Sequence, residues 1–269
     1  MTYFGFLLQF VVVPIVVLGI FVYRDRRMGK ALPQSLRLLP PALVLVVLVG
    51  IALIYTTPWD NYLVATGVWW YDPALVTGIT LGWVPIEEYT FFILQPILTG
   101  LWVLFLARRV HVVDAPFKPR SGVRVVSVVG VGAVWFASLL LLLSGWKPGN
   151  YLSLELVWAL PPIALQLAFG ADILWHYRRL VFVSIASATL YLCGMDALAI
   201  ASGTWTINPE LSLDVLLGGV LPVEEAVFFL LTNMLLVFGL VLGLATESAY
   251  RLPAQIIGGK VSQSERLTQ

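Results

Sequence analysis

Seven long apolar stretches constrain this chain more than any other feature of its sequence. A helix that crosses the hydrocarbon core of a bilayer, about 30 Å thick, needs roughly 20 apolar residues. Stretches of that kind lie near residues 3–22, 41–65, 80–106, 123–144, 153–175, 180–201 and 217–243. With 59% hydrophobic and only 12% charged residues, the chain has too little polar surface for a soluble domain. The sequence therefore predicts an all-α polytopic membrane protein with seven transmembrane helices.

Basic residues alternate between the two ends of these predicted helices. All but one of the 16 Lys and Arg residues follow the first, third, fifth or seventh stretch, and only Lys147 lies on the other side. Cytoplasmic loops carry the excess of basic residues, so the N-terminus is expected outside and the C-terminus in the cytoplasm. That alternation requires an odd number of helices. We expect the chain to be integral to the cell membrane.

Two segments repeat each other, VPIEEYTFFIL at 84–94 and LPVEEAVFFLL at 221–231, and their prolines are 137 residues apart. Upstream, Tyr55, Asp60 and Trp69 recur at an offset of 136 as Tyr191, Asp196 and Trp205. The match before Tyr55 is weak. Parallel repeats of this kind are related by a pseudo-twofold axis along the membrane normal.

The repeat predicts two parallel three-helix units joined by a linker helix. Their boundaries are 1–106 for the first unit, 107–148 for the linker with the fourth helix, 149–245 for the second unit, and 246–269 for a cytoplasmic tail expected to be disordered.

Each repeat places two adjacent acids inside an apolar run, Glu87 and Glu88 in the first and Glu224 and Glu225 in the second. With the third helix starting near residue 80, these acids would lie about 10 Å along it. Burial and a neighbouring carboxylate both disfavour the ionised form, so one acid of each pair is expected to keep its proton. A protonated acid beside a carboxylate is the pair that acid–base chemistry needs.

Helical spacing places aromatic rings on the same face as one acid of each pair. The two sets are Glu88, Phe91, Phe92 and Gln95, and Glu225, Phe228, Phe229 and Thr232. Because aromatic faces attract cations, such a face could stabilise a carbocation. The Phe pairs could equally face lipid.

Less specific interpretations stay open for several of these polar and aromatic residues. The glutamates could cap their helices at the water interface, favoured by the helix dipole. Asp60 and Asp196 could serve the site or form a structural hydrogen bond. Trp69 and Trp205 are expected to be interfacial anchors, and Asp172 is expected to pair with an arginine.

The motifs resemble the lycopene cyclase domain family, the small flavin-free integral-membrane carotenoid cyclases. The family's repeated three-helix unit carries a P-x-E-E-like motif followed by aromatic residues. Here these are Pro85, Glu87, Glu88, Phe91 and Phe92, and Pro222, Glu224, Glu225, Phe228 and Phe229. Some members consist of two separate subunits, and this chain looks like the fused form.

The resemblance implies a redox-neutral cyclisation of the linear ψ-ends of lycopene, an isomerase reaction of carotenoid biosynthesis with a β ring, as in β-carotene, as the expected product. Glu88 and Glu225 would donate the proton, and Glu87 and Glu224 would act as bases or partners. Phe91, Phe92, Phe228, Phe229, Asp60, Asp196, Gln95 and Thr232 would bind or support the substrate.

No cofactor and no metal is expected, because the hydrogen count does not change. The expected partners are a hydrophobic carotenoid from the bilayer and membrane lipid, without nucleic acid, and other carotenoid enzymes are left open. The ring type and the number of sites, one composite or two, also stay open.

A transporter is the alternative from another functional class. Parallel three-helix repeats around a linker occur in carriers, and intramembrane acids often relay protons. The clustering of acids near one face and the scarcity of polar residues inside the helices disfavour a hydrophilic path. The spans contain no lysine, so a retinal Schiff base is excluded.

Overall fold

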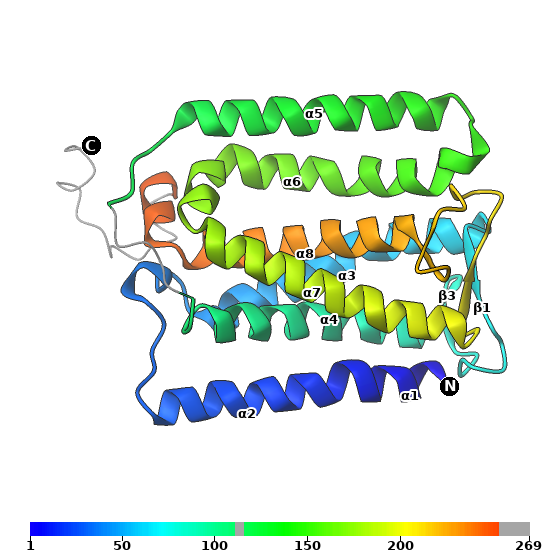
Figure 1. The fold of residues 1–269 in the computed structure, drawn as a ribbon, viewed down its shortest axis with the longest axis horizontal. Coiled ribbons are helices and arrows are strands. Elements are labelled where there is room, and N and C mark those ends of the chain that lie inside the picture. The colour runs from blue at the N-terminus through cyan, green and yellow to red at the C-terminus, as the bar shows by residue number, and fades with distance from the viewer. Residues whose placement is uncertain (111–115, 253–269) are drawn as a thin grey trace.

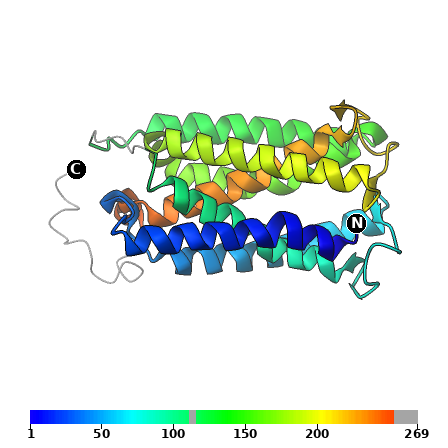
Figure 2. The same ribbon diagram turned by 60° about the horizontal axis from the view of Figure 1, so that its bottom comes forward.

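The computed structural model describes residues 1–110 and 116–252. In this part of the chain, seven helices are long and apolar enough to cross a membrane, as predicted. They run along the long axis of the molecule (Figure 1) and stay roughly parallel to one another when the view is turned (Figure 2). The chain folds as an all-α membrane protein.

The first helix consists of α1 (Tyr3–Leu7), a π-helical turn (Leu8–Val12) and α2 (Val13–Arg27). The others are α3 (Pro41–Ala65), α4 (Ile86–Leu106), α5 (Ser121–Leu143), α6 (Asn150–His176), α7 (Arg178–Ala201) and α8 (Val223–Leu244). Short 3-10 helices cover Gln34–Leu36, Lys147–Gly149 and Thr246–Arg251. The strands are β1 (Trp69–Tyr71), β2 (Thr80–Leu81), β3 (Val84–Pro85), β4 (Trp205–Ile207), β5 (Leu216–Leu217) and β6 (Leu221–Pro222).

The start of the third and seventh membrane helices differs from the prediction. Residues 80–85 form the β2–β3 hairpin, and α4 begins only at Ile86. Gly82, with φ +71°, makes the tight turn between the two strands, which a residue without Cβ adopts easily. Glu87 and Glu88 therefore lie in the first turn of α4, not about 10 Å along it.

The second repeat has the same design, with the β5–β6 hairpin leading into α8. Its turn has three residues, 218–220, where the first repeat has two, 82–83. This extra residue explains why the repeat offset changes from 136 before the hairpin to 137 after it.

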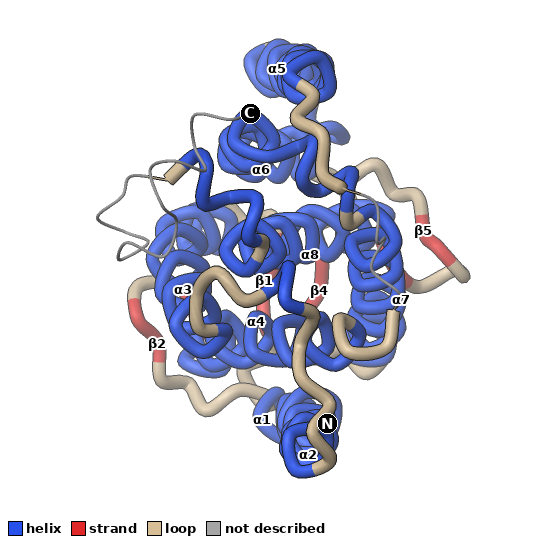
Figure 3. Tube along the Cα trace, turned by 90° about the vertical axis from the view of Figure 1, so that its left-hand side faces the viewer, coloured by secondary structure: helices blue, strands red, loops and turns tan. Residues whose placement is uncertain are grey.

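Strands β1 and β4 make the pseudo-twofold relation visible. They pair antiparallel with Trp70 opposite Thr206, and these two positions are themselves equivalent by the offset of 136. An antiparallel pair of equivalent strands has a twofold axis through its central residue pair. Figure 3 shows β1 and β4 near the centre, with β2 beyond α3 on one side and β5 beyond α7 on the other. The two halves are thus packed around one axis.

Helices α4 and α8 form the interior, with α3 and α7 beside them, and α5 lies at the edge of the bundle beyond α6 (Figures 1 and 3). Close packing of α3 and α8 depends on glycine: a Cβ at Gly243 would lie 2.8 Å from Val44, and one at Gly239 would lie 2.7 Å from Leu48. Small residues let membrane helices approach closely in this way.

Two ion pairs tie the helices together at the end of the bundle opposite the strands. Asp25, in the last turn of α2, accepts two hydrogen bonds from the Arg109 guanidinium, at 2.7 and 2.9 Å. Asp172, in α6, is held in the same way by Arg251, at 2.7 and 2.8 Å. The prediction that Asp172 pairs with an arginine is confirmed.

The predicted disorder of the tail is wrong for its first residues. Residues 246–251 form a 3-10 helix whose Ser248 and Ala249 are buried. The Arg251–Asp172 ion pair anchors this segment to α6. Residues 253–269 lie outside the described part of the chain.

Candidate active site

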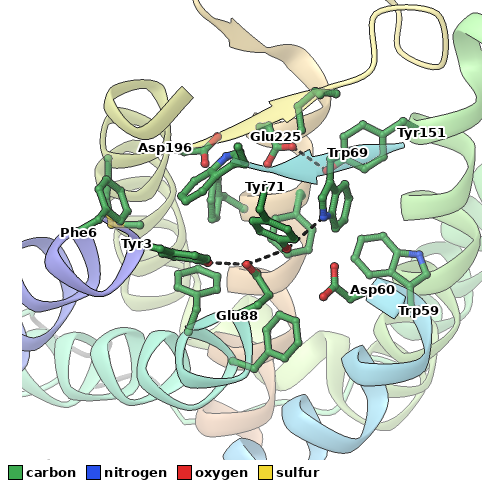
Figure 4. Close-up of a pocket in the computed structure, with 17 residues that line it drawn as sticks. Tyr3, Phe6, Trp59, Asp60, Trp69, Tyr71, Glu88, Tyr151, Asp196 and Glu225 are labelled. Carbon is green, nitrogen blue, oxygen red and sulfur yellow. Dashed lines mark hydrogen bonds between the residues drawn. The ribbon is translucent and has the colours of Figure 1, made fainter. Parts of the chain in front are cut away.

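A narrow cavity of about 50 Å³ (Figure 4) lies beside the β1–β4 ribbon, at the end of the bundle where Figure 1 places the N-terminus. Both repeats contribute aromatic and acidic side chains to it. The lining consists of Tyr3, Phe6, Trp59, Asp60, Trp69, Tyr71, Glu88, Phe91, Phe92, Tyr151, Met195, Asp196, Trp205, Ile207, Glu225, Phe228 and Phe229. Glu88 of the first motif and Glu225 of the second therefore line the same cavity.

Glu88 is held by two phenols (Figure 4). The Tyr3 hydroxyl donates to Glu88 Oε2 at 2.5 Å, and the Tyr71 hydroxyl donates to the same oxygen at 3.1 Å. Trp69 Nε1 in turn donates to the Tyr71 hydroxyl at 3.2 Å. This chain of donors fixes the orientation of the carboxyl group at the cavity wall.

Glu225 occupies the equivalent place in the second half but has fewer partners. The Tyr151 hydroxyl donates to Glu225 Oε1 at 2.8 Å. The repeat equivalent of Tyr71 is Ile207, which lines the cavity without a hydroxyl. The two acids thus occupy equivalent positions in the two repeats but differ in their hydrogen bonding.

The Tyr71 phenol is protonated at any physiological pH. Burial raises the pKa of Tyr71 well above its ordinary value, and the neighbouring Glu88 carboxyl raises it further. The hydroxyl therefore acts as a hydrogen-bond donor to Glu88.

Asp60 and Asp196 face the same cavity, from α3 and α7 (Figure 4). Each is buried, and among the described residues no partner contacts its Oδ2. A buried carboxyl oxygen without a hydrogen-bond partner is costly, and an ionisable residue inside a membrane span is by default a candidate functional residue. This placement agrees with the site interpretation of both aspartates.

Glu87 and Glu224 are buried but are absent from the cavity lining. Glu87 Oε1 accepts a hydrogen bond from the Thr77 amide at 2.6 Å, and Glu224 Oε1 accepts one from the Leu213 amide at 2.6 Å. Each glutamate therefore holds the loop that precedes its own hairpin. The contact is the same in both repeats. It keeps the two glutamates away from the cavity, where a base would have to act.

The structure places the predicted Phe, Gln and Thr residues at different depths in the bundle. Phe91, Phe92, Phe228 and Phe229 all line the cavity, so their lipid-facing alternative is wrong. Gln95 and Thr232 lie deeper, outside its lining. Gln95 donates to Asn233 and Thr99, each at 3.3 Å, and Thr232 donates to the Phe228 carbonyl at 2.9 Å.

Trp69 and Trp205 line the cavity, so the prediction that they are interfacial anchors is wrong. The ribbon that they form with their neighbours turns them inward. Trp69 lies edge-on to Tyr151 at 5.3 Å, and Trp205 lies 5.0 Å from Tyr3, measured between ring centroids.

Sequence reasoning missed three tyrosines and one acid. Tyr3 and Tyr151 occupy equivalent places in the two halves, but the match between helices α1–α2 and α6 is too weak to reveal it. Tyr71 has no counterpart hydroxyl in the second repeat. Glu155, one turn after Tyr151, is fully buried with no partner for either carboxyl oxygen in the described part of the chain. An acid inside an apolar span was the available signal for it.

The chemistry available in this cavity is proton transfer beside aromatic faces. It offers carboxyl groups oriented by phenols, carboxyl oxygens that are free to accept a proton, and rings that can stabilise a cation. Among the described residues, no cluster of three His, Cys, Asp or Glu side chains could hold a metal ion.

Comparison with known proteins gives one consistent result. The family model described as lycopene cyclase matches residues 1–106 and 149–242, the two repeats without the linker. A protein of Halobacterium salinarum named lycopene beta-cyclase is 41% identical over 197 residues, which cover 73% of this chain and 80% of that protein.

Fungal proteins named bifunctional lycopene cyclase/phytoene synthase match in the same way. That of Gibberella fujikuroi is 36% identical over 202 residues, and that of Podospora anserina is 35% identical over 199 residues. These matches cover 73% and 72% of this chain and 34% of each fungal protein. No solved structure matches the chain significantly.

Proposed function

The chain belongs to the lycopene cyclase family, and we propose that it closes the ψ-ends of lycopene into β rings by acid–base catalysis in this cavity. The observation that carries the mechanism is the presence of Glu88 and Glu225, each oriented by a tyrosine, in one aromatic cavity. The relatives give no support to a transporter.

The reaction starts with a proton from Glu88 or Glu225 to the terminal double bond of the substrate. The tertiary cation that results is attacked by the nearby alkene, which forms the carbon–carbon bond of a six-membered ring. A base then removes one proton, and its removal from the ring carbon that carries the polyene chain gives the β ring. One proton is gained and one is lost, so the reaction is an isomerisation and its stoichiometry requires no redox cofactor.

Asp60 and Asp196 are our choice for the bases. Both line the cavity and each carries a buried oxygen without a described partner, whereas Glu87 and Glu224 are engaged with loop amides. The carboxylates and the faces of the Phe and Trp residues together would stabilise the intermediate cations. In this assignment Glu87 and Glu224 position the loops, whereas Glu88 and Glu225 contact the substrate.

We also propose that the N-terminus lies outside and the C-terminus in the cytoplasm. The basic residues near the ends of α2, α4 and α8 and the start of α7 gather at the end of the bundle opposite the cavity, which is the cytoplasmic end by the positive-inside rule. The cavity then opens near the outer leaflet, and the substrate and surrounding partners are a carotenoid and membrane lipid.

The mechanism is tested by cyclisation in D₂O. Purified protein in proteoliposomes is given lycopene, and the products are analysed by mass spectrometry. Proton donation by an exchangeable acid predicts one deuterium per ring formed, and none in the lycopene recovered unreacted. Rings without deuterium, or products with fewer hydrogens than lycopene, would contradict the proposal.

A further inference from the structure

Two apolar grooves open on the lipid-facing sides of the bundle, closer to its middle than the cavity is. The first, which we term the α3–α6 groove, has a volume of about 180 Å³ and is lined by Leu48, Ile51, Ala52, Tyr55, Thr56, Phe91, Phe92, Gln95, Pro96, Trp158, Pro162, Gln166, Phe228, Thr232, Leu235 and Leu236. The second, the α2–α7 groove, has a volume of about 420 Å³ and is lined by Pro14, Val17, Leu18, Phe21, Leu98, Thr99, Trp102, Phe105, Ser187, Ala188, Tyr191 and Leu192.

The two grooves are counterparts by the repeat. Ala52 and Tyr55 correspond to Ala188 and Tyr191 at the offset of 136. The same hydrogen bond closes one side of each groove: the Tyr55 hydroxyl donates to the Trp158 carbonyl at 2.8 Å, and the Tyr191 hydroxyl donates to the Phe10 carbonyl at 2.6 Å.

Of the two grooves, as far as the described residues show, the α3–α6 groove is the one that adjoins the cavity. It shares Phe91, Phe92 and Phe228 with the cavity lining, whereas the α2–α7 groove shares no lining residue with it. The aromatic rings of Phe91, Phe92 and Phe228 therefore form a common wall between the hollow on the lipid side and the acids.

A stack of aromatic rings follows the same path. Tyr55, which is 40% exposed, stacks on Trp158 at 5.5 Å, and Trp158 stacks on Trp59 at 4.4 Å. Trp59 stacks on Phe228 at 5.7 Å, with the two ring planes only 7° apart. In the other half the equivalent of Trp59 is Met195, so this stack exists on one side only.

We propose that the α3–α6 groove admits the carotenoid from the bilayer and seats its polyene chain while one ψ-end occupies the cavity. A flat, extended hydrocarbon fits an apolar groove with an aromatic wall, where burial of its surface supplies the binding free energy. The assignment rests on the proposed function, because it takes lycopene as the substrate.

The test compares bulky substitutions at equivalent positions of the two grooves. Ala52→Phe fills the α3–α6 groove and Ala188→Phe fills the α2–α7 groove. A second pair at lipid-exposed positions, Ile51→Trp and Val17→Trp, guards against misfolding, and melting curves establish that the variants fold. We expect Ala52→Phe and Ile51→Trp to lower cyclisation at least about tenfold, as loss of apolar contact area would. The two α2–α7 variants should match the parent protein.

Lycopene retention supplies a readout independent of catalysis. In the inactive Glu88→Gln/Glu225→Gln background, purified protein should retain lycopene, and Ala52→Phe should abolish this retention while Ala188→Phe should not. Equal effects of the two groove variants, or full activity and retention with Ala52→Phe, would overturn the inference. A parent protein that does not cyclise lycopene would refute the proposed function instead.

Discussion

At the scale of single residues, the unequal surroundings of the two cavity glutamates have a measurable consequence. Glu88 accepts from Tyr3 and Tyr71, whereas Tyr151 is the one described phenol that donates to Glu225. A hydrogen bond to a charged group contributes about 1.5–3 kcal/mol, and each acid becomes charged when it donates its proton. In a Glu88→Gln background, where Glu225 is the remaining donor, Tyr151→Phe should therefore lower the cyclisation rate by roughly 10- to 100-fold. In a Glu225→Gln background, Tyr3→Phe should lower the rate less, because Tyr71 still donates to Glu88. Initial rates in proteoliposomes measure both, and a larger loss with Tyr3→Phe would contradict this account.

Substitutions of Glu87 can show whether this residue holds the loop or acts as a base. Its Oε1 accepts the Thr77 amide, and the carboxamide oxygen of glutamine can accept the same bond. We expect Glu87→Gln to keep cyclisation within about tenfold of the parent, since a neutral bond replaces a charge-assisted one. Glu87→Ala should lose more activity and melt at a lower temperature.

If Glu87 were the base, glutamine would be as inactive as alanine at this position. Activity assays and melting curves of the two variants, with the equivalent pair at Glu224, separate the two roles.

At the scale of elements, the contact between α3 and α8 depends on small residues. Gly243 faces Val44, whose branched side chain has little freedom to move. Gly243→Leu should destabilise the protein by about 1–3 kcal/mol through overpacking. Gly130→Leu on α5, where a Cβ would meet nothing within 4 Å, is the matched control and should leave the melting temperature unchanged. Equal melting temperatures for the two variants would show that the contact is not tight.

The helices were predictable from sequence because a membrane span needs a long apolar run, and the repeated motifs pointed to two related halves. The starts of α4 and α8 were not predictable, because hairpin residues such as Leu81 and Val84 extend the apolar run without being helical. The glutamates and phenylalanines were found because both repeats carry them. Tyr3 and Tyr151 were not identified because the sequences of their helices have diverged. Trp69 and Trp205 were wrongly predicted because what turns them inward is the pairing of two strands that lie 136 residues apart in the sequence.

At the scale of the whole molecule, the cavity exists only where the two halves meet. Glu88, Tyr3 and Asp60 come from the first half, and Glu225, Tyr151 and Asp196 come from the second. Fragments 1–118 and 119–269, co-expressed in lycopene-accumulating cells, should reassemble through the helix contacts and form cyclic carotenoid. Each fragment alone should form none, and pigment analysis that found rings with one fragment would refute the composite site.

The most direct test of the central claim, one site with two proton-donating glutamates, is pigment analysis of lycopene-accumulating cells that express single and double variants. Glu88→Gln/Glu225→Gln should lower total ring formation by about 100-fold or more, the usual contribution of a positioned acid, whereas each single variant should keep part of it because the other acid can still donate. Glu210→Gln, at an exposed acid of the β4–β5 loop, is the control and should match the parent. Full activity in the double variant would contradict the account, because no proton-donating glutamate would then remain in the cavity.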